Sequence, residues 1–114
     1  MVNYFAPTLD LTFNALSHPI RRGILTQLAR GAASIKDLAR PFNISLPAIL
    51  KHIGILEKAG LVATNKEGRV KTCQLNAAPM QEAVEWLAFY EQFWNQQFDS
   101  LATFLEETND PTTP

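Results

Sequence analysis

Residues 45–60, SLPAILKHIGILEKAG, decide the fold that this chain is expected to adopt. Ser45 can cap a helix through its hydroxyl, and Pro47 fits the first turn, where backbone N–H groups have no partner within the helix. Gly60 supplies the left-handed residue that ends many helices. Between them, apolar residues recur with helical spacing on one face: Ile49, Leu50, Ile53, Ile55 and Leu56.

The other face of this predicted helix is small, partly polar and cationic in its N-terminal half. It carries Ser45, Leu46, Ala48, Lys51 and His52. A helix that enters a DNA major groove by its N-terminal end needs such a surface. We therefore interpret this stretch as a recognition helix.

A second, shorter helix is predicted directly before it. Residues 34–37, SIKD, match the capping-box pattern S-x-x-D. Pro41 cannot lie deep in a helix, so this helix is expected to end near Arg40. Because only residues 41–44 then separate the two helices, the sequence predicts a helix-turn-helix.

A β-hairpin is predicted after Gly60. Residues 61–65 and 69–75 are rich in β-branched side chains and flank Lys66-Glu67-Gly68, in which the glycine can adopt positive φ. The tip of this hairpin carries Lys66, Arg69 and Lys71. A basic hairpin that follows a recognition helix is the wing of a winged helix.

Three further helices complete a mainly α fold with about five helices and one β-hairpin. The first covers residues 9–16, and the second covers residues 19–30, with Arg21 and Arg22 directed outward. The last covers residues 79–107 and has an apolar surface too wide for one neighbour to cover. The sequence therefore predicts a homodimer that forms through the first and last helices.

The length of 114 residues suits one domain. Residues 9–107 are expected to form this winged helix-turn-helix domain. Residues 1–8 are expected to be an extended lead-in, and residues 108–114 a disordered tail.

Charge is divided sharply along the chain. All ten Lys and Arg lie between Arg21 and Lys71, against three acids there, which gives this segment a net charge of +7. From Thr72 onward the chain has seven acids and no Lys or Arg. The basic middle can meet a polyanion, whereas the acidic end faces a different partner.

Several protein classes are excluded by composition. No apolar run approaches the length of a membrane span, and the N-terminus lacks the pattern of a secretory signal. Cys73 is the single cysteine, so a cytoplasmic location is expected. The chain has no Gly-rich phosphate loop and no Ser/His/Asp or Cys/His cluster, so we do not expect an enzyme.

Three segments carry a family resemblance: ALSHPIRRGILTQL, IKDLARPFNISLPAILKHIGILEKAGLV and KEGRVKTCQL. They resemble the ArsR/SmtB family of winged helix-turn-helix repressors, and WLAFYEQFWNQQFDSLATFLEE is similar to the last helix of that family. The resemblance implies a cytoplasmic homodimer that binds an operator near its own or a neighbouring promoter. We expect this operator to be an imperfect palindrome in double-stranded DNA, because two recognition helices would enter successive major grooves. The resemblance also implies repression that ends when a signal weakens DNA binding.

The metal-sensing motif of that family, Cys-Val-Cys-Asp-Leu, is absent, because residues 34–38 read SIKDL. An alternative site on the last helix needs histidine, and none follows His52. A disulfide or polysulfide sensor needs two cysteines. We therefore expect no metal site and no cofactor, and the identity of any small-molecule inducer stays open.

Ten residues are predicted to contact DNA. Lys51 would reach a guanine edge or a phosphate, unless it is a solvated helix lysine. His52 either contacts DNA or is a hydrogen-bonded histidine where the helix meets the hairpin. One of Arg21 and Arg22 is expected to face phosphate and the other an internal carboxylate. The ten residues are Lys36, Arg40, Ser45, Leu46, Pro47, Ala48, Lys51, His52, Arg69 and Lys71.

Nine apolar residues are predicted to form the dimer contact. Cys73 is expected to be a small strand hydrophobe rather than a redox switch. Two alternatives stay open: that aromatic residues of the last helix wall a small-molecule pocket, and that the dimer is a protein-interaction module with weak DNA affinity. The nine residues are Leu9, Phe13, Leu16, Val84, Leu87, Trp94, Phe98, Leu101 and Leu105.

Overall fold

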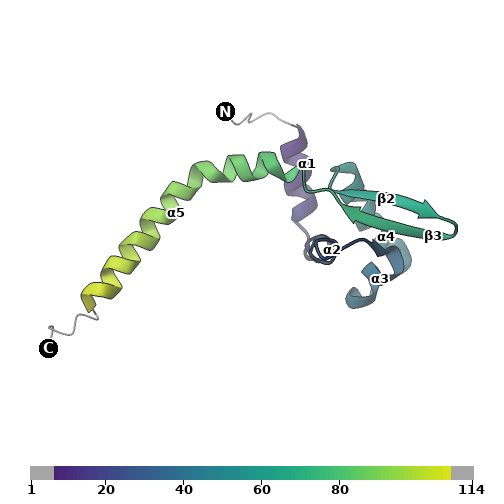
Figure 1. The fold of residues 1–114 in the computed structure, drawn as a ribbon, viewed down its shortest axis with the longest axis horizontal. Coiled ribbons are helices and arrows are strands. Elements are labelled where there is room, and N and C mark those ends of the chain that lie inside the picture. Colours follow the sequence, from purple (N-terminus) through teal and green to yellow (C-terminus); the bar gives the residue numbers. More distant parts are fainter. Residues whose placement is uncertain (1–6, 109–114) are drawn as a thin grey trace. The chain divides into compact units, whose positions relative to one another are not determined.

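The computed structural model describes residues 7–108, which divide into two compact units between Ala83 and Val84. The elements, labelled in Figure 1, are α1 (Pro7–Leu16), α2 (Pro19–Leu28), β1 (Ala33–Ser34), α3 (Ile35–Ala39), the 3-10 helix η1 (Arg40–Phe42), α4 (Leu46–Lys58), β2 (Val62–Glu67), β3 (Val70–Leu75) and α5 (Met80–Thr108).

The predicted winged helix-turn-helix with five α-helices and a hairpin is confirmed, and several boundaries move. Pro7 and Thr8 belong to α1, so they are not part of an extended lead-in, and α2 ends two residues earlier than expected. Neither β1 nor η1 was predicted, because two or three residues are too few for a periodic pattern. Residues 1–6 and 109–114, on which the rest of the predicted lead-in and tail fall, lie outside the described part.

Serine side chains begin both helices of the helix-turn-helix, as predicted. The Oγ of Ser34 accepts from the backbone N of Asp37 at 3.2 Å, and the Oγ of Ser45 accepts from the backbone N of Ala48 at 3.3 Å. Between the helices the chain turns at Asn43, whose φ of 50° is left-handed. This turn places α4 directly against α3.

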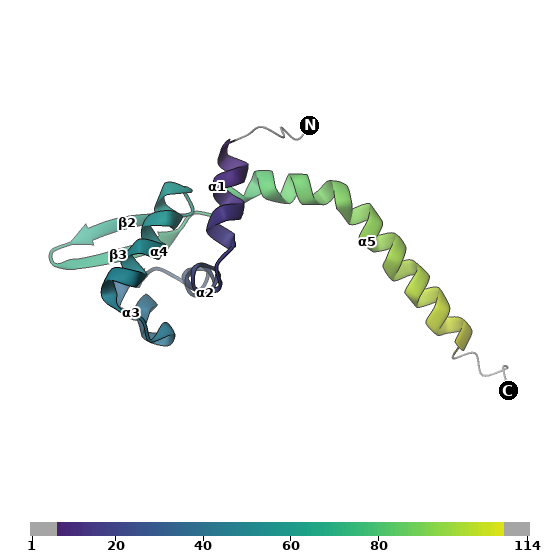
Figure 2. The ribbon, with the colours of Figure 1, turned by 180° about the vertical axis from the view of Figure 1, so that it is seen from behind.

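A three-stranded antiparallel sheet, in the order β1-β3-β2, carries the hairpin. Glu67 pairs with Val70, so the connecting turn is only Gly68 and Arg69, shorter than the predicted loop at residues 66–68. Gly68 has a φ of 62°, which favours glycine. Figures 1 and 2 both show β2 and β3 running side by side, with their turn beyond α3 and α4.

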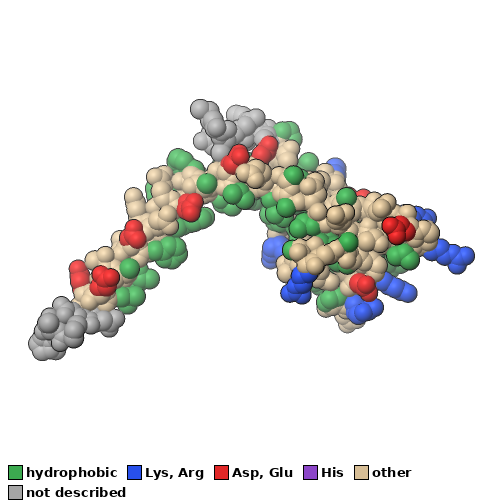
Figure 3. Space-filling model, viewed as in Figure 1, with side chains coloured by type: hydrophobic (Ala, Val, Ile, Leu, Met, Phe, Trp, Pro, Cys, Tyr) green, Lys and Arg blue, Asp and Glu red, His purple; other side chains and the backbone are tan. Residues whose placement is uncertain are grey.

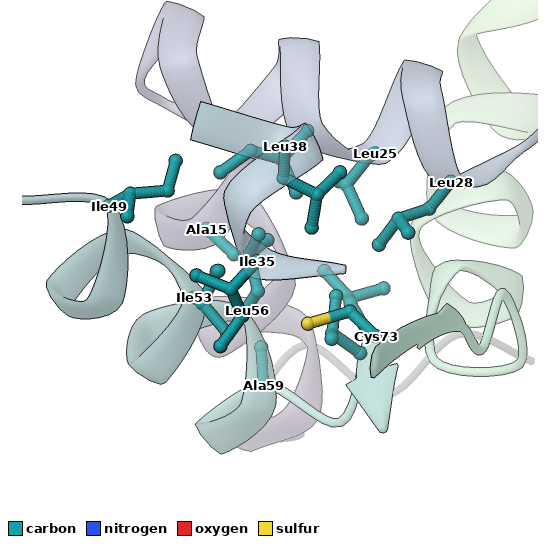
Figure 4. Close-up of a cluster of buried hydrophobic side chains, with 13 residues drawn as sticks. Ala15, Leu25, Leu28, Ile35, Leu38, Ile49, Ile53, Leu56, Ala59 and Cys73 are labelled. Carbon is teal, nitrogen blue, oxygen red and sulfur yellow. The ribbon is translucent and has the colours of Figure 1, made fainter. Parts of the chain in front are cut away.

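One hydrophobic core joins the elements of the first unit. Side chains of α2, α3 and α4 converge on Cys73 of β3, as Figure 4 shows. The buried face of α4 is formed by Ile49, Ile53 and Leu56, which are all fully enclosed. Burying each such side chain stabilises the fold by about 1.5–3 kcal/mol. The core therefore holds the back of α4 rigidly and leaves its front free.

Candidate nucleic-acid interface

The front of α4 is the surface that the sequence predicted. Ser45, Leu46, Pro47 and Lys51 are exposed along it, and Ala48 is half-buried. All of them lie on the N-terminal half of the helix, opposite the buried stripe. Because backbone N–H groups at a helix N-terminus attract anions, this end suits contact with a phosphate or a base edge.

The hairpin adds a concentrated positive charge. Lys66 and Lys71 are direct cross-strand partners, and both are exposed together with Arg69 of the turn. Like charges placed opposite each other destabilise a sheet. Their presence here favours a polyanion as the partner of the hairpin, since its charge would remove this repulsion. Figure 3 shows Lys and Arg side chains gathered at the hairpin tip and over the neighbouring helices.

A groove of about 490 Å³ brings the helix-turn-helix and the hairpin together. Four of the predicted DNA contacts, Lys36, Leu46, Arg69 and Lys71, share this groove although they come from three separate elements. The full lining is Ser34, Ile35, Lys36, Leu46, Leu50, Arg69, Val70 and Lys71.

Arg40, a further predicted contact, is paired rather than free. Its Nη2 lies 3.1 Å from Oδ1 of Asp37, and both side chains are largely exposed. Exposed pairs of this kind contribute at most about 1 kcal/mol. The pair can therefore open, but Asp37 lowers the positive potential around Arg40 in the free protein.

His52 lies behind this surface, in a cluster with α2. Its Nδ1 is 3.2 Å from Nη1 of Arg21, and its ring centroid is 4.5 Å from that of His18. Of the two expectations for His52, the structure shows the hydrogen-bonded histidine. Its partner belongs to α2, however, and not to the hairpin. Burial lowers the pKa of His52 below its ordinary value. Nearby positive charge, first from His18 and Arg21 and then from Lys51, lowers that pKa further.

The prediction that Arg21 points outward is wrong. Only 7% of its surface is exposed. Its Nε donates to the carbonyl oxygen of Ala15 at 2.9 Å, and its Nη2 donates to that of Asn14 at 3.0 Å. The carbonyl groups at the end of α1 lack hydrogen-bond donors within their helix, and the guanidinium of Arg21 donates to two of them. Arg22 is exposed, as expected, and donates to the carbonyl of Leu16 at 2.7 Å. Whether it also faces phosphate stays a prediction.

Residues 16–65 match the model of a helix-turn-helix domain family. The transcriptional repressor SdpR of Bacillus subtilis is 36% identical over 79 residues, which cover 69% of this chain and 88% of SdpR. A crystal structure of an ArsR family transcriptional regulator is 40% identical, covers 83% of this chain and 97% of the other, and has a TM-score of 0.75. The chain belongs to the ArsR family.

A third relative extends the likeness along the whole chain. The HTH-type transcriptional regulator Rv2034 of Mycobacterium tuberculosis is 29% identical over 112 residues, which cover 98% of this chain and all of that protein. The ArsR family protein described here is accordingly a DNA-binding transcriptional regulator with a winged helix-turn-helix, and it is not an enzyme.

This ArsR family chain gives its cysteine a structural role. Cys73 is fully buried in the core, and its Sγ lies 3.9 Å from Oγ1 of Thr64. Burial raises the pKa of the Cys73 thiol, which keeps it protonated. Among residues 7–108, no group of three or more His, Cys, Asp and Glu side chains could hold a metal ion. Within the same range, no helix is long and apolar enough to cross a membrane.

The predicted dimer residues divide between the two units. Leu9 is only 6% exposed, so it belongs to the core of its own chain, and Leu16 is half-buried. Phe13 is exposed on α1, as is Leu11. The remaining predicted residues are all exposed on α5: Val84, Leu87, Trp94, Phe98, Leu101 and Leu105.

Considered alone, α5 has a long apolar side. Figure 3 shows hydrophobic side chains along its lower edge and acidic side chains along its upper edge. Phe98 is 66% exposed. Ring pairs such as Trp86–Tyr90, with centroids 5.0 Å apart, follow the same helix. Whether these aromatic residues also wall a ligand pocket stays a prediction.

Proposed function

We propose that this protein is a transcriptional repressor that binds an imperfect palindromic operator in duplex DNA as a homodimer. The observation that carries the proposal is the convergence of α4, α3 and the hairpin on one basic surface. SdpR, which is named a transcriptional repressor, supports the negative sign of control. Because its target is DNA, we place the protein in the cytoplasm.

Each element has its own task on the DNA. The N-terminal half of α4 enters the major groove, where Lys51 reaches a guanine edge and Leu46, Pro47 and Ala48 face thymine methyl groups. The Ser45 hydroxyl contacts phosphate at the margin of the groove. Lys36 and Arg40 bind phosphates beside α4, and Arg69 and Lys71 follow the flanking backbone.

The exposed apolar side of α5 supports the dimer. One copy can offer it to the same side of another, which is how a two-fold interface is built. Phe13 of α1 joins this contact. The two copies of α4 would then enter successive major grooves about 34 Å apart. An unidentified small-molecule inducer would end repression by weakening this complex.

The test begins with selection of the operator from random duplex DNA. Lys51→Ala should weaken operator binding by about 1–3 kcal/mol and relax the preference at one base pair. Lys58→Ala is the matched control, since this lysine is exposed at the far end of the same helix. Fluorescence anisotropy at several salt concentrations measures both, and affinity should fall about 10³–10⁵-fold between 50 and 200 mM salt.

Three results would contradict the proposal. If selection returned no enriched motif, the protein-interaction module would become the better function. If affinity did not depend on salt, the basic surface would not be the contact. If Lys51→Ala lost the same affinity for operator and random DNA, Lys51 would bind phosphate and not a base.

A further inference from the structure

We infer that the groove between α3, α4 and the hairpin binds a small amphipathic organic anion, and that this ligand excludes DNA. The second part rests on the proposed function, because it needs DNA to bind the same surface. The ligand would combine a carboxylate head with an apolar body of medium length. The inference comes from the unusual mixture of side chains that line this groove.

The walls of the groove are aliphatic and unprotected. Leu46, Leu50 and Val70 are 56%, 40% and 53% exposed, and they surround the buried Ile35. Isolated exposed leucines are common on protein surfaces, but these face one shared hollow. Their contact with water is unfavourable, and a hydrocarbon body would replace that water. The sugar–phosphate backbone of DNA is hydrophilic and does not meet this need.

Positive charge surrounds the apolar walls. Lys36, Arg69 and Lys71 belong to the lining, and no lining residue is acidic. The carboxylate nearest in sequence to Lys36, that of Asp37, is already paired with Arg40. The hydroxyl of Ser34 uses its oxygen to accept from the backbone of Asp37, so its proton can still be donated. The head group that complements these donors is an anion.

The size of the groove limits the occupant to one small molecule. Its volume of about 490 Å³ lies within the range of about 300–1,000 Å³ that is typical of ligand sites. Lys36, Arg69 and Lys71 are also the proposed phosphate contacts. A carboxylate held by them would take their charge away from DNA, so both partners cannot use the surface at once.

Decanoate is a suitable probe, with acetate and decan-1-ol as controls for the charge and for the apolar body. Isothermal titration calorimetry on the full chain without DNA should show saturable binding of decanoate only. Leu50→Ser should weaken this binding about tenfold, because it removes an apolar wall. Leu11→Ser is the matched control, since Leu11 is similarly exposed on α1, outside the groove. Circular dichroism checks that every sample stays folded.

Anisotropy then measures DNA binding at increasing decanoate. Decanoate should displace duplex DNA from the wild type, and about tenfold more should be needed for Leu50→Ser. Without decanoate, Leu50→Ser should bind DNA within about twofold of the wild type. Arg69→Ala should weaken both ligands, whereas Arg30→Ala should leave decanoate binding unchanged because Arg30 is outside the groove.

The inference is overturned if decanoate does not bind saturably, or if Leu50→Ser and Leu11→Ser bind it equally. It is also overturned if decanoate binds and DNA stays bound. A protein that binds decanoate as expected but no DNA in any condition would instead refute the proposed function. The calorimetric readout keeps these two failures apart.

Discussion

Burial of apolar side chains differs between residues 7–83 and residues 84–108. The first region buries side chains of α1–α4 and of the hairpin in a common core, whereas no side chain of the second is buried. Charge differs as well, because the first region has all ten Lys and Arg and the second has none and five acids. The first region covers its apolar side chains with its own contacts and offers charge to DNA. The second needs another surface to cover it.

The largest effect is expected where the second region meets its partner. Leu101→Asp places a carboxylate on the apolar side of α5 and should convert a dimer into a monomer. Because only one half-site can then bind, operator affinity should fall roughly 10²-fold or more. Gln97→Asp, at an exposed polar position of the same helix, is the control. Analytical ultracentrifugation would disprove this interface if Leu101→Asp stayed dimeric.

The next-largest effect is expected from a buried side chain of the first region. Arg21→Met leaves the carbonyl of Ala15 without its donor, whereas the carbonyl of Asn14 still accepts from Ser17. The free energy of unfolding should therefore fall by about 1–3 kcal/mol. Arg22→Met should cost less than about 1 kcal/mol, because the Arg22 side chain is exposed. Urea denaturation measures both variants. Equal losses would mean that burial of Arg21 adds nothing.

Two glycines test the packing of the first region. A Cβ added to Gly23 of α2 would lie 2.7 Å from the ring of Phe42, whereas one added to Gly54 of α4 would meet nothing within 4 Å. Gly54→Ala should therefore stabilise the fold by about 0.5–1 kcal/mol through helix propensity. Gly23→Ala should be less stable than Gly54→Ala by about 1–2 kcal/mol, because Phe42 must move. Thermal unfolding that ranked Gly23→Ala higher would contradict this packing.

The smallest effect is expected from pH. Arginine only donates, so the Nδ1 of His52 must accept from Arg21, and protonation removes that acceptor. The pKa of His52 is lowered in the folded chain, so its contribution to stability is present above the ordinary histidine value of about 6.5. It should be lost as pH falls from that value through the lowered pKa of the folded chain. His52→Asn should show a weaker decline in urea denaturation between about pH 7 and 5.5, and an unchanged slope would exclude His52 as the source.

Local patterns predicted the fold where the chain follows its own periodicity. The serine caps at Ser34 and Ser45 needed only neighbouring residues, and both are confirmed. The apolar stripe of α4 is confirmed at Ile49, Ile53 and Leu56. Leu50, predicted on the same face, is instead 40% exposed.

The prediction for Arg21 failed because the environment of this side chain depends on where α1 ends. No local sequence pattern reveals the carbonyl groups that it reaches. An informative signal was present, since α1 has no basic residue in its last turn to satisfy its carbonyls.

The candidate site could be predicted in part, because some of its residues also follow local sequence patterns. Lys36, Arg69 and Lys71 could be named individually from helix and hairpin patterns. Their meeting around one groove, with Leu50 and Val70 between them, depends on the register of β1 with β3 and was not predictable. Leu9, predicted at the dimer contact, is covered by its own chain, since helical spacing identifies an apolar side but not which surface will cover it.

Ser34 has two structural roles at once. It pairs with Thr72 as the last residue of β1, and its hydroxyl caps α3. A displacement of the hairpin should therefore also move the start of α3, so the hairpin and the helix-turn-helix should move together as one body. Exchange of exposed side chains on α4 or on the hairpin should therefore change the DNA sequence that is preferred without changing the spacing between these two elements.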